Sequence, residues 1–417
     1  MIAFAVEVYG RAPSNGHKPL TLQDNSLYRV KECIWDTGER FAFTVGPDGL
    51  GSYWPVLYAV TRLRYSGKAV GTMMGRARSV ALFHDWAASR EIDVLQRLQG
   101  LSFFSLVEIE GLRRTLKLAS PGTRRGDAEV SSKVWIDRCK NVAAYIAWHA
   151  EFGFDKLDRK DPWLPEARRR LEDCSAWLVD DLPTPIQTGR EGLTEVEQVA
   201  LLRAIVPGSP SNPFERRNQV RNFALVLSYY ELGLRLSEAL AMKTVDLRLE
   251  GPTPTAMVVR RADDPDDPRA RQPLVKTKAR PLPVSRALAL LLSQWVTDHR
   301  ADKERYPKVR KTPFLFVSHF GTPLTKDAVG LIFRTLRSCP GVPSNFSPHI
   351  LRHTWNDRFS KLAGELELRE AVELQTRNFL MGWSDTSMQG LAYSRRAIKD
   401  EADRLMLRMQ EATVAGA

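Results

Sequence analysis

A polar stretch divides the chain into two parts, each of which needs a hydrophobic core of its own. The stretch VDDLPTPIQTGREGLT, from Val179 to Thr194, mixes prolines and glycines with polar residues and has no apolar periodicity. Such a sequence is typical of a domain linker. The chain has 417 residues, of which 43% are hydrophobic, and this is enough apolar material for more than one core. We therefore place a linker at residues 183–193.

The part before the linker changes character near residue 65. Residues 1–65 contain short alternating stretches such as Arg40–Val45, which favour strands. From Gly67 the apolar residues follow helical periodicity, with one predicted buried face formed by Ala81, Leu82, Trp86, Leu95 and Leu98. We expect a helical domain over residues 66–182. For residues 1–65 we expect a separate segment, whose role the sequence does not assign; an arm-type DNA contact and a protein contact are the two candidates.

The part after the linker combines helices with a few strands. Helices are predicted from Thr194 and from Arg217, followed by a three-stranded patch between Thr255 and Val284 and by more helices to about residue 410. The predicted fold class is mainly α with a small β-sheet, of the α+β type.

The charge balance points to a polyanionic partner. Lysine and arginine number 61 against 49 acidic residues, giving a net charge of +12. This excess favours nucleic acid, although a solvated basic surface remains the alternative. In the first domain, basic residues alternate with Trp135, Tyr145 and Trp148, which suits a surface that grips the DNA backbone unless these aromatics form the core. The candidate DNA contacts there are Arg124, Arg125, Lys133, Arg138 and Lys140.

The cysteines and the hydropathy indicate a reducing compartment. The four cysteines contain no CxxC pair, so neither a disulfide framework nor a thiolate zinc site is predicted. No apolar run reaches the roughly 18 residues of a membrane span, and the amino terminus lacks the basic region of a signal peptide. We expect a cytoplasmic protein that is associated with the nucleoid when bound to DNA.

The first motif with chemical content is ELGLRLSEALAMKTVDL, from Glu231 to Leu247. A helix is predicted to end at Gly233 and another to begin near Leu236, which places Arg235 in the break. A guanidinium held there has its planar donors available for a phosphate, and Glu238, one turn later, is suited to orient it. A surface ion pair between Arg235 and Glu238 is the alternative.

The second motif is RQPLVKTKARPLPVS, from Arg271 to Ser285. Two short apolar stretches flank a polar turn, which predicts a hairpin with Lys276, Lys278 and Arg280 crowded at its tip. A lysine with other cations nearby has a lowered pKa and is suited to protonate a leaving oxygen. Lys278 and Arg280 are further candidate DNA contacts, although a solvated basic turn has the same pattern.

The third motif, SPHILRHTWNDRF from Ser347 to Phe359, predicts the start of a helix. Ser347 is a suitable N-cap and Pro348 fits the first helical position, so His349 and Arg352 share a face near the amino terminus, where an anion is favoured. His349 and His353 have the spacing of zinc ligands, but no glutamate follows the first histidine and no third ligand is evident. A metal site is therefore disfavoured.

The fourth motif is LMGWSDTSMQGLAYS, from Leu380 to Ser394. A Gly-Trp turn is followed by Tyr393, which is the only tyrosine after His349. The indole N–H of Trp383 is suited to donate to a phosphate oxygen, although a tryptophan is as often part of the core.

These motifs, in this order, resemble the catalytic set of the tyrosine recombinases, or phage integrase family. GLRLSEAL is similar to the first arginine box, KTKARPLPV to the lysine hairpin, HILRHT to the second box, and PFLFVSHFGTPLTKDAVG to the strand and turn between them. The resemblance covers about residues 193–400. It implies a catalytic domain over residues 194–402, a helical core-binding domain before it, and a C-terminal helix or tail over residues 403–417 that contacts a neighbouring protomer.

The resemblance also implies a reaction and its residues. Tyr393 would be the nucleophile that forms a 3′-phosphotyrosyl bond, with Arg235, Arg352 and Trp383 holding the phosphate. His349 would be the base and Lys276 the acid, and Glu238 and His353 would support them. The family needs no metal, ATP or cofactor, binds double-stranded DNA, and exchanges strands through a four-way junction as a homotetramer, in some cases with DNA-bending or partner recombinase proteins.

Three departures from the family pattern are present. One additional residue separates Trp383 from Tyr393, the stretch between Arg352 and Trp383 is longer than usual, and tryptophan replaces the more common histidine at residue 383. Related chemistry is found in type IB topoisomerases and hairpin-telomere resolvases. A basic DNA-binding protein without catalysis is an alternative of another class.

Overall fold

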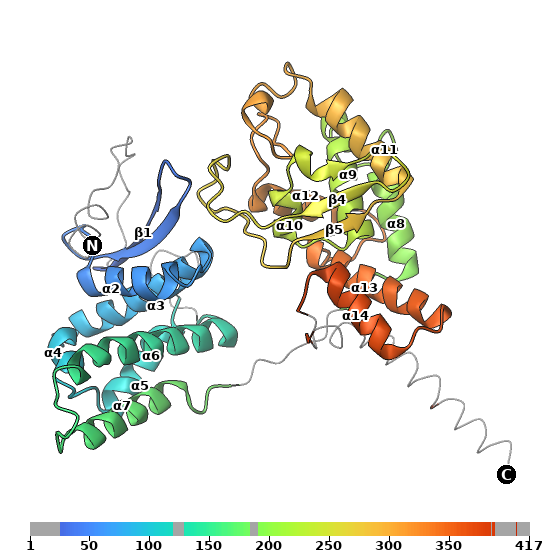
Figure 1. Cartoon of the computed structure of the whole chain (residues 1–417). Helices are drawn as coiled ribbons and strands as arrows, with labels where there is room; N and C mark the ends of the chain where they lie inside the picture. The colour runs from blue at the N-terminus through green and yellow to red at the C-terminus, as the bar shows by residue number, and fades with distance from the viewer. Residues whose placement is uncertain (1–25, 120–128, 184–190, 385, 388–405, 407–417) are drawn as a thin grey trace, which may run out of the picture. The chain divides into compact units, whose positions relative to one another are not determined.

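The computed structural model describes residues 26–119, 129–183, 191–384, 386–387 and 406, which lie in two compact units (Figure 1). The first unit extends to Gln187 and the second begins at Thr188, so the division falls inside the polar stretch 183–193. Helices predominate, and the strands of the described residues form small antiparallel sheets. The fold is therefore of the α+β type, as the sequence predicts.

The first unit opens with a two-stranded sheet. Strand β1 (Arg29–Ile34) pairs antiparallel with β2 (Arg40–Val45), which confirms the predicted strand, and every residue of β2 is buried. The helical segments α2 (Tyr53–Tyr58) and η1 (Ala59–Arg64) follow, and α3 (Val70–Ala88) packs against β2. Phe41 of β2 and Phe83 of α3 belong to one core. The described residues before 65 are thus continuous with the helical unit, in contrast to the predicted separate segment.

The remaining helices of this unit enclose the same core. They are α4 (Val94–Gln99), α5 (Leu106–Lys117), α6 (Ser132–Phe154) and α7 (Leu164–Val179). Helix α6 packs against α3, α4 and α7. Leu95, predicted to be buried, is 44% exposed. The reason is that α3 ends at Ala88 and α4 starts afresh after the N-cap Asp93, so one helical period does not run through both.

The aromatic residues of α6 belong mainly to the core. Tyr145 and Trp148 are buried, and the hydroxyl of Tyr145 lies 3.1 Å from Nε2 of His84. Of the two alternatives for these aromatics, a DNA-gripping surface or the core, the core is therefore the correct one for these two. Arg138 donates from Nη1 to the carbonyls of Leu116 (2.9 Å) and Leu118 (2.6 Å). Lys133 and Lys140 are exposed, whereas Arg124 and Arg125 lie outside the described residues.

In the second unit, the long helix α9 (Arg216–Leu232) is central, because both α11 and α13 pack against it. Ala224, Leu225 and Tyr229 of α9 are fully buried in its core. The other helical segments of this unit are α8 (Glu195–Ile205), α10 (Leu236–Ala241), η2 (Thr244–Asp246), α11 (Arg286–Gln294), η3 (Trp295–Arg300), η4 (Val309–Lys311), α12 (Lys326–Leu336), α13 (Pro348–Glu365) and α14 (Glu370–Met381). None of the helices in the described part of the chain is long and apolar enough to span a membrane.

A three-stranded antiparallel sheet lies beside these helices, in the order β3–β4–β5. Its strands are β3 (Leu247–Arg248), β4 (Thr255–Val258) and β5 (Arg280–Pro283). Strands β4 and β5 lie in the region predicted for the three-stranded patch, Thr255 to Val284, but the third strand, β3, precedes it. The predicted hairpin within residues 271–285 is wrong. Residues 271–279 form no strand, and β5 pairs with β4, so that Arg280 lies opposite Val258. The cross-strand partner is distant in sequence, which a local alternating pattern does not reveal.

The core of the first unit gives a stability prediction. Leu112 on α5 is fully buried, whereas Val107 on the same helix is 82% exposed. We expect Leu112→Ala to lower the free energy of unfolding by about 2–5 kcal/mol, because it removes buried methyl groups and leaves a cavity. Val107→Ala should change it by less than about 0.5 kcal/mol. Urea denaturation of both variants measures this difference, and equal losses would contradict the position of α5.

Candidate active site

The first arginine lies in a helix break that glycine makes possible. Gly233 ends α9 with φ of +59°, and a Cβ there would lie 2.9 Å from Met381 Cε and from Trp355 Cγ. Glycine is therefore required for both the left-handed backbone and the close approach. Arg235, two residues later, is the N-cap of α10, so the predicted break is confirmed. Its backbone N–H donates to Glu238 Oε2 (2.9 Å), and its Nη1 donates to the carbonyl of Met381 (3.2 Å).

The second arginine comes from α13 and meets the first. The Ser347 hydroxyl accepts from the Ile350 N–H, and Pro348 is the first helical residue, as predicted. Arg352 is 1% exposed and donates from Nη1 to the carbonyl of Gly233 (2.6 Å) and from Nη2 to that of Met381 (3.4 Å). Arg235 and Arg352, far apart in sequence, thus share the Met381 carbonyl at the end of α14.

Trp383 packs against both guanidinium groups. It is 6% exposed, and its ring centroid lies 6.0 Å from Cζ of Arg235 and 5.5 Å from Cζ of Arg352. Cations at this distance from an indole are attracted by the ring quadrupole. The backbone N–H of Trp383 donates to the carbonyl of Asn378 (2.9 Å), which continues the end of α14. The indole is therefore part of the arginine cluster rather than of a separate core.

Glu238 is the carboxylate at the centre of this cluster. Its side chain is fully buried, and both of its oxygens accept from Arg280, at 3.2 Å and 3.1 Å. Oε1 also accepts from the Thr277 hydroxyl (2.7 Å), and Nη1 of Arg352 lies 4.0 Å from Oε2. One carboxylate thus faces the guanidinium groups of Arg235, Arg280 and Arg352, so these four side chains together carry a net positive charge. Such a site favours an anion.

The protonation of Glu238 follows from two opposing effects. Burial raises the pKa of this carboxyl group, but the charges of Arg280 and Arg352 and the hydrogen bonds from Arg280 and the Arg235 backbone outweigh burial. The pKa is lowered from its ordinary value of 4.5. The carboxylate is therefore ionised near neutral pH and holds the guanidinium groups in place.

Arg280 is a structural partner of Glu238, in contrast to the predicted position at an exposed hairpin tip. Its side chain is 2% exposed and also donates from Nε to the carbonyl of Leu380 (2.6 Å). The sequence contains no local signal for this, because the carboxylate partner lies on helix α10, 42 residues earlier in the chain. Thr277 was not predicted either, although it lies within the KTKAR motif.

His349 and His353 form a pair on the first turns of α13. Their Nε2 atoms lie 3.1 Å apart, so one imidazole N–H donates a hydrogen bond to the ring nitrogen of the other. His349 is exposed and His353 is half-buried. Among the residues that the structure describes, no group of three or more histidine, cysteine, aspartate or glutamate side chains is arranged to hold a metal ion.

Lys276 and Lys278 are exposed on the segment that leads into β5. The backbone N–H of Lys278 donates to the carbonyl of Gly382 (3.1 Å), which ties this segment to the end of α14. Burial lowers the pKa of Lys326, and the charges of Lys276, Arg269 and Arg271 lower it further. Lys276 therefore lies in a positively charged neighbourhood, as the sequence predicts. Lys326, the first residue of α12, was not identified from the sequence.

The predicted set is brought together only in part by the described residues. One cluster contains Arg235, Arg352, Trp383 and Glu238. Thr277, the residue after Lys276, donates a hydrogen bond to Glu238 in this cluster. Tyr393 lies outside the described residues, as does most of the predicted helix at residues 403–417. The assignment of Tyr393 therefore remains a prediction.

The fold and this arginine cluster define a tyrosine recombinase domain. Residues 194–397 match the model of the phage integrase family, so this part of the chain is similar to the catalytic domain of tyrosine recombinases. The match begins one residue before α8 and includes every motif residue described above.

Individual relatives agree with this assignment. The chain is 27% identical to tyrosine recombinase XerD of Mycobacterium leprae over 197 residues, which are 46% of this chain and 54% of the relative. It is also 27% identical to tyrosine recombinase XerC of Bradyrhizobium diazoefficiens over 146 residues, 35% of this chain and 39% of the relative. The chain thus spans about half the length, or less, of these relatives.

A solved structure supports the fold. The XerH site-specific recombinase bound to a palindromic difH substrate in a post-cleavage complex superposes with a TM-score of 0.50. The match covers 80% of this chain and 79% of XerH at 16% identity. The similarity therefore concerns the fold.

The position of Glu238 predicts a pH-dependent effect of Glu238→Gln. The variant should lower the free energy of unfolding by on the order of 3 kcal/mol at neutral pH, because buried guanidinium groups lose their counter-charge. Since the pKa of Glu238 is lowered by folding, its contribution is fully present above pH 4.5 and is lost as the pH falls further. The difference between wild type and variant should therefore narrow below that pH.

Urea denaturation at pH 7 and at pH 3.5 measures this effect. Glu195→Gln is a matched control, because Glu195 is 82% exposed and pairs with Lys361 on the surface. That control should lose less than about 1 kcal/mol. A constant difference between wild type and Glu238→Gln at both pH values would contradict the ionised state of Glu238.

Proposed function

We propose that this protein is a site-specific DNA recombinase that cuts and rejoins duplex DNA through a 3′-phosphotyrosyl intermediate at Tyr393. The observation that carries the proposal is the convergence of Arg235 and Arg352 on the Met381 carbonyl, with Trp383 against both guanidinium groups. These residues come from separate motifs of the phage integrase family. Their clustering is the arrangement that holding one phosphate requires.

In the proposed reaction, the phenol oxygen of Tyr393 attacks a backbone phosphorus in line. A bond from this oxygen to phosphorus forms, the bond from phosphorus to the 5′-oxygen breaks, and a 5′-hydroxyl leaves. A 5′-hydroxyl from another strand then attacks the phosphotyrosine and releases Tyr393. Each step exchanges one phosphate ester for another, so the reaction needs no ATP. Two rounds of exchange pass through a four-way junction.

The residues of the site divide the work as follows. Arg235, Arg352 and the indole of Trp383 stabilise the charge on the non-bridging oxygens, which grows in the transition state. His349, paired with His353, accepts the proton of Tyr393, and Lys276 protonates the leaving 5′-oxygen. Glu238 acts through the arginines as a positioning residue. No step calls on a metal ion, so cleavage should resist a chelator.

The partner is double-stranded DNA. XerH, which shares the fold, was captured with difH DNA before and after cleavage. We propose that the helical first unit binds the core of the DNA site, with Lys133 and Lys140 as exposed cations on α6, and that Lys278 contacts the backbone near the catalytic centre. We further propose a homotetramer on paired sites, assisted by DNA-bending or partner recombinase proteins, in the cytoplasm and associated with the nucleoid.

Covalent capture tests the nucleophile. Wild type expressed in bacterial cells should retain DNA after non-covalent contacts are removed with detergent, and Tyr393→Phe should retain none. Sequencing the attached DNA would map the cleavage site. Adducts that persist in Tyr393→Phe would assign the nucleophile to another residue. If wild type forms no adducts, DNA binding without cleavage becomes the leading function.

The arginine cluster gives a prediction for the rate. Arg235 is the better probe than Arg352, because its side chain is 28% exposed and its loss leaves the buried contacts of Arg352 intact. Arg235→Ala should cleave about 10²- to 10³-fold more slowly, since one preorganised donor is lost. Single-turnover cleavage of the mapped site, with a gel-shift assay for binding, measures both properties. Cleavage at the wild-type rate would contradict the proposed role of Arg235.

A two-site substrate separates recombination from topoisomerase chemistry. A recombinase joins strands from two duplexes, whereas a type IB topoisomerase rejoins the strand that it cut. Recombinant product that depends on Tyr393 supports the proposal. Relaxation of supercoils without recombinant product would favour the topoisomerase.

A further inference from the structure

Lys276 lies on a connection that has no regular backbone structure to hold it. Strand β4 ends at Val258 and β5 begins at Arg280, and residues 259–279 between them are described throughout but form neither helix nor strand. A tight hairpin would fix its tip through ladder hydrogen bonds. Apart from the backbone hydrogen bond from Lys278 to Gly382, the position of Lys276 must be set by side-chain contacts.

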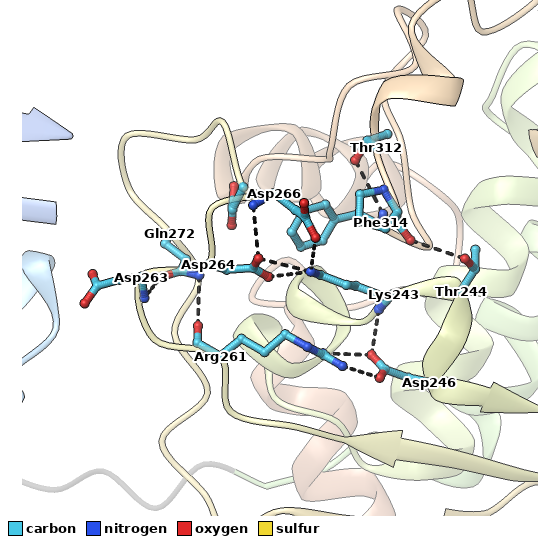
Figure 2. A network of polar contacts seen from close by, with 12 residues as sticks. Lys243, Thr244, Asp246, Arg261, Asp263, Asp264, Asp266, Gln272, Thr312 and Phe314 are labelled. Carbon is cyan, nitrogen blue, oxygen red and sulfur yellow. Dashed lines mark hydrogen bonds and ion pairs between the residues drawn. The ribbon is translucent and has the colours of Figure 1, made fainter. Parts of the chain in front are cut away.

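A group of charged residues anchors this connection, and we name it the charged clamp. At its centre, Nζ of Lys243 lies 2.8 Å from Asp264 and 2.7 Å from Asp266 (Figure 2). The side chains of Lys243 and Asp264 are only 8% and 5% exposed. The clamp consists of Lys243, Asp246, Arg261, Asp264, Asp266, Asp267 and Arg269.

A second anchor lies beside the first. Arg261 binds Asp246 with both terminal nitrogens, at 2.5 Å and 3.0 Å, as Figure 2 shows. Oδ2 of Asp246 also accepts from the backbone N–H of Lys243 (2.8 Å). The short turn after α10 therefore holds the beginning of the connection at two neighbouring points.

The third anchor holds the middle of the connection. Nη2 of Arg269 lies 2.8 Å from Asp267, whose side chain is fully buried. The same guanidinium donates to the carbonyl of Leu324 (2.6 Å) and to that of Leu240 (3.1 Å). These carbonyls belong to the end of α10 and to the segment before α12. Arg269 thus ties the connection to two other parts of the unit.

The residues on both sides of Lys276 are held in place by their own contacts. Gln272 links the connection to itself, because its amide donates to the Arg261 carbonyl (2.9 Å) and accepts from the Asp263 N–H (3.1 Å). Val275 is 1% exposed in the core, and Thr277 donates to Glu238. Lys276 between them is exposed.

We infer that the charged clamp positions Lys276. Lys243 therefore affects protonation of the leaving group indirectly, by holding Lys276 in place. This inference rests on the proposed function. Buried ion pairs contribute little net stability compared with apolar packing, so their presence here is better explained by the geometry that they specify. A displacement of about 1 Å at a reacting group can cost about 10²-fold in rate.

The ionisation of the clamp agrees with this role. Burial alone would lower the pKa of Lys243, but its hydrogen bonds to Asp264 and Asp266 raise the pKa above the ordinary 10.5. The amine is therefore charged throughout the pH range in which the enzyme would work, and the anchor does not loosen by titration.

The test compares two substrates that differ in their need for a proton donor. Both are synthetic duplexes that contain the cleavage site mapped by the Tyr393 adducts. One has an ordinary phosphodiester and the other has sulfur in place of the 5′-bridging oxygen. A thiol has a pKa of about 8.5, far below that of an alcohol, so the thiolate leaves without an acid.

The variants are Lys276→Ala, Lys243→Met and the control Lys361→Met. Lys361 also forms an ion pair, but on the surface, where its side chain is 67% exposed. On the oxygen substrate we expect Lys276→Ala and Lys243→Met to cleave about 10²-fold more slowly than wild type. On the sulfur substrate both should be within a few-fold of wild type, and the control should match wild type on both.

Each other outcome overturns a specific claim. Equal slowing of Lys243→Met on both substrates would mean that its defect does not pass through Lys276, and an unchanged rate would mean that the clamp does not position it. Failure of sulfur to rescue Lys276→Ala would remove the acid role and the inference together. If wild type cleaves neither substrate, the proposed function itself fails.

A less disruptive variant is available in case Lys243→Met does not fold. If Lys243→Met has no cooperative unfolding transition in urea, Arg261→Gln carries the same comparison, because Arg261 is 25% exposed and its replacement leaves Lys243 with both of its aspartates. The same pattern of slowing and rescue is expected. Arg261→Lys, which keeps the charge, should recover part of the rate on the oxygen substrate.

Discussion

The arrangement of the arginine cluster in the second unit depends on the contacts of the Glu238 carboxylate. It accepts from Arg280 and Thr277, lies 4.0 Å from Arg352 and caps the backbone at Arg235. Three buried or half-buried guanidinium groups without it would repel one another in a medium of low dielectric. Because the partners come from separate segments, this single acid brings the first box, the second box and the strand after the lysine into one site.

The carboxyl end of α14 is the second constraint, and it complements the first. The carbonyls of Leu380 and Met381 lack helical partners, and Arg280, Arg235 and Arg352 donate to them. The negative end of the helix dipole also favours these cations. Gly382 allows the approach, since its φ is +65° and a Cβ there would lie 2.5 Å from Nη1 of Arg280. The helix end thereby places Trp383 against the arginines.

The sequence predicted the parts of this site that are encoded locally. The break at Gly233, the Ser347 cap and the strand Arg40–Val45 depend on neighbouring residues, and each was confirmed. The burial of Arg280 and the pairing of β5 with β4 were not predictable, because the partners of both are distant in sequence. For the same reason, the pattern KTKAR predicted a hairpin tip, although strand β5 begins only at Arg280.

The two arginines of the boxes are not equivalent, and this difference bears on how the site would meet DNA. Arg352 is enclosed by the carbonyls of Gly233 and Met381, whereas the side chain of Arg235 is 28% exposed. A phosphate would therefore meet Arg235 first, since Arg352 is only 1% exposed. At Arg352 a phosphate oxygen can take the place of one of these carbonyls. Since the carbonyls are neutral and the phosphate is charged, the exchange favours the phosphate. In the free protein the two carbonyls hold the terminal nitrogens of Arg352 in place.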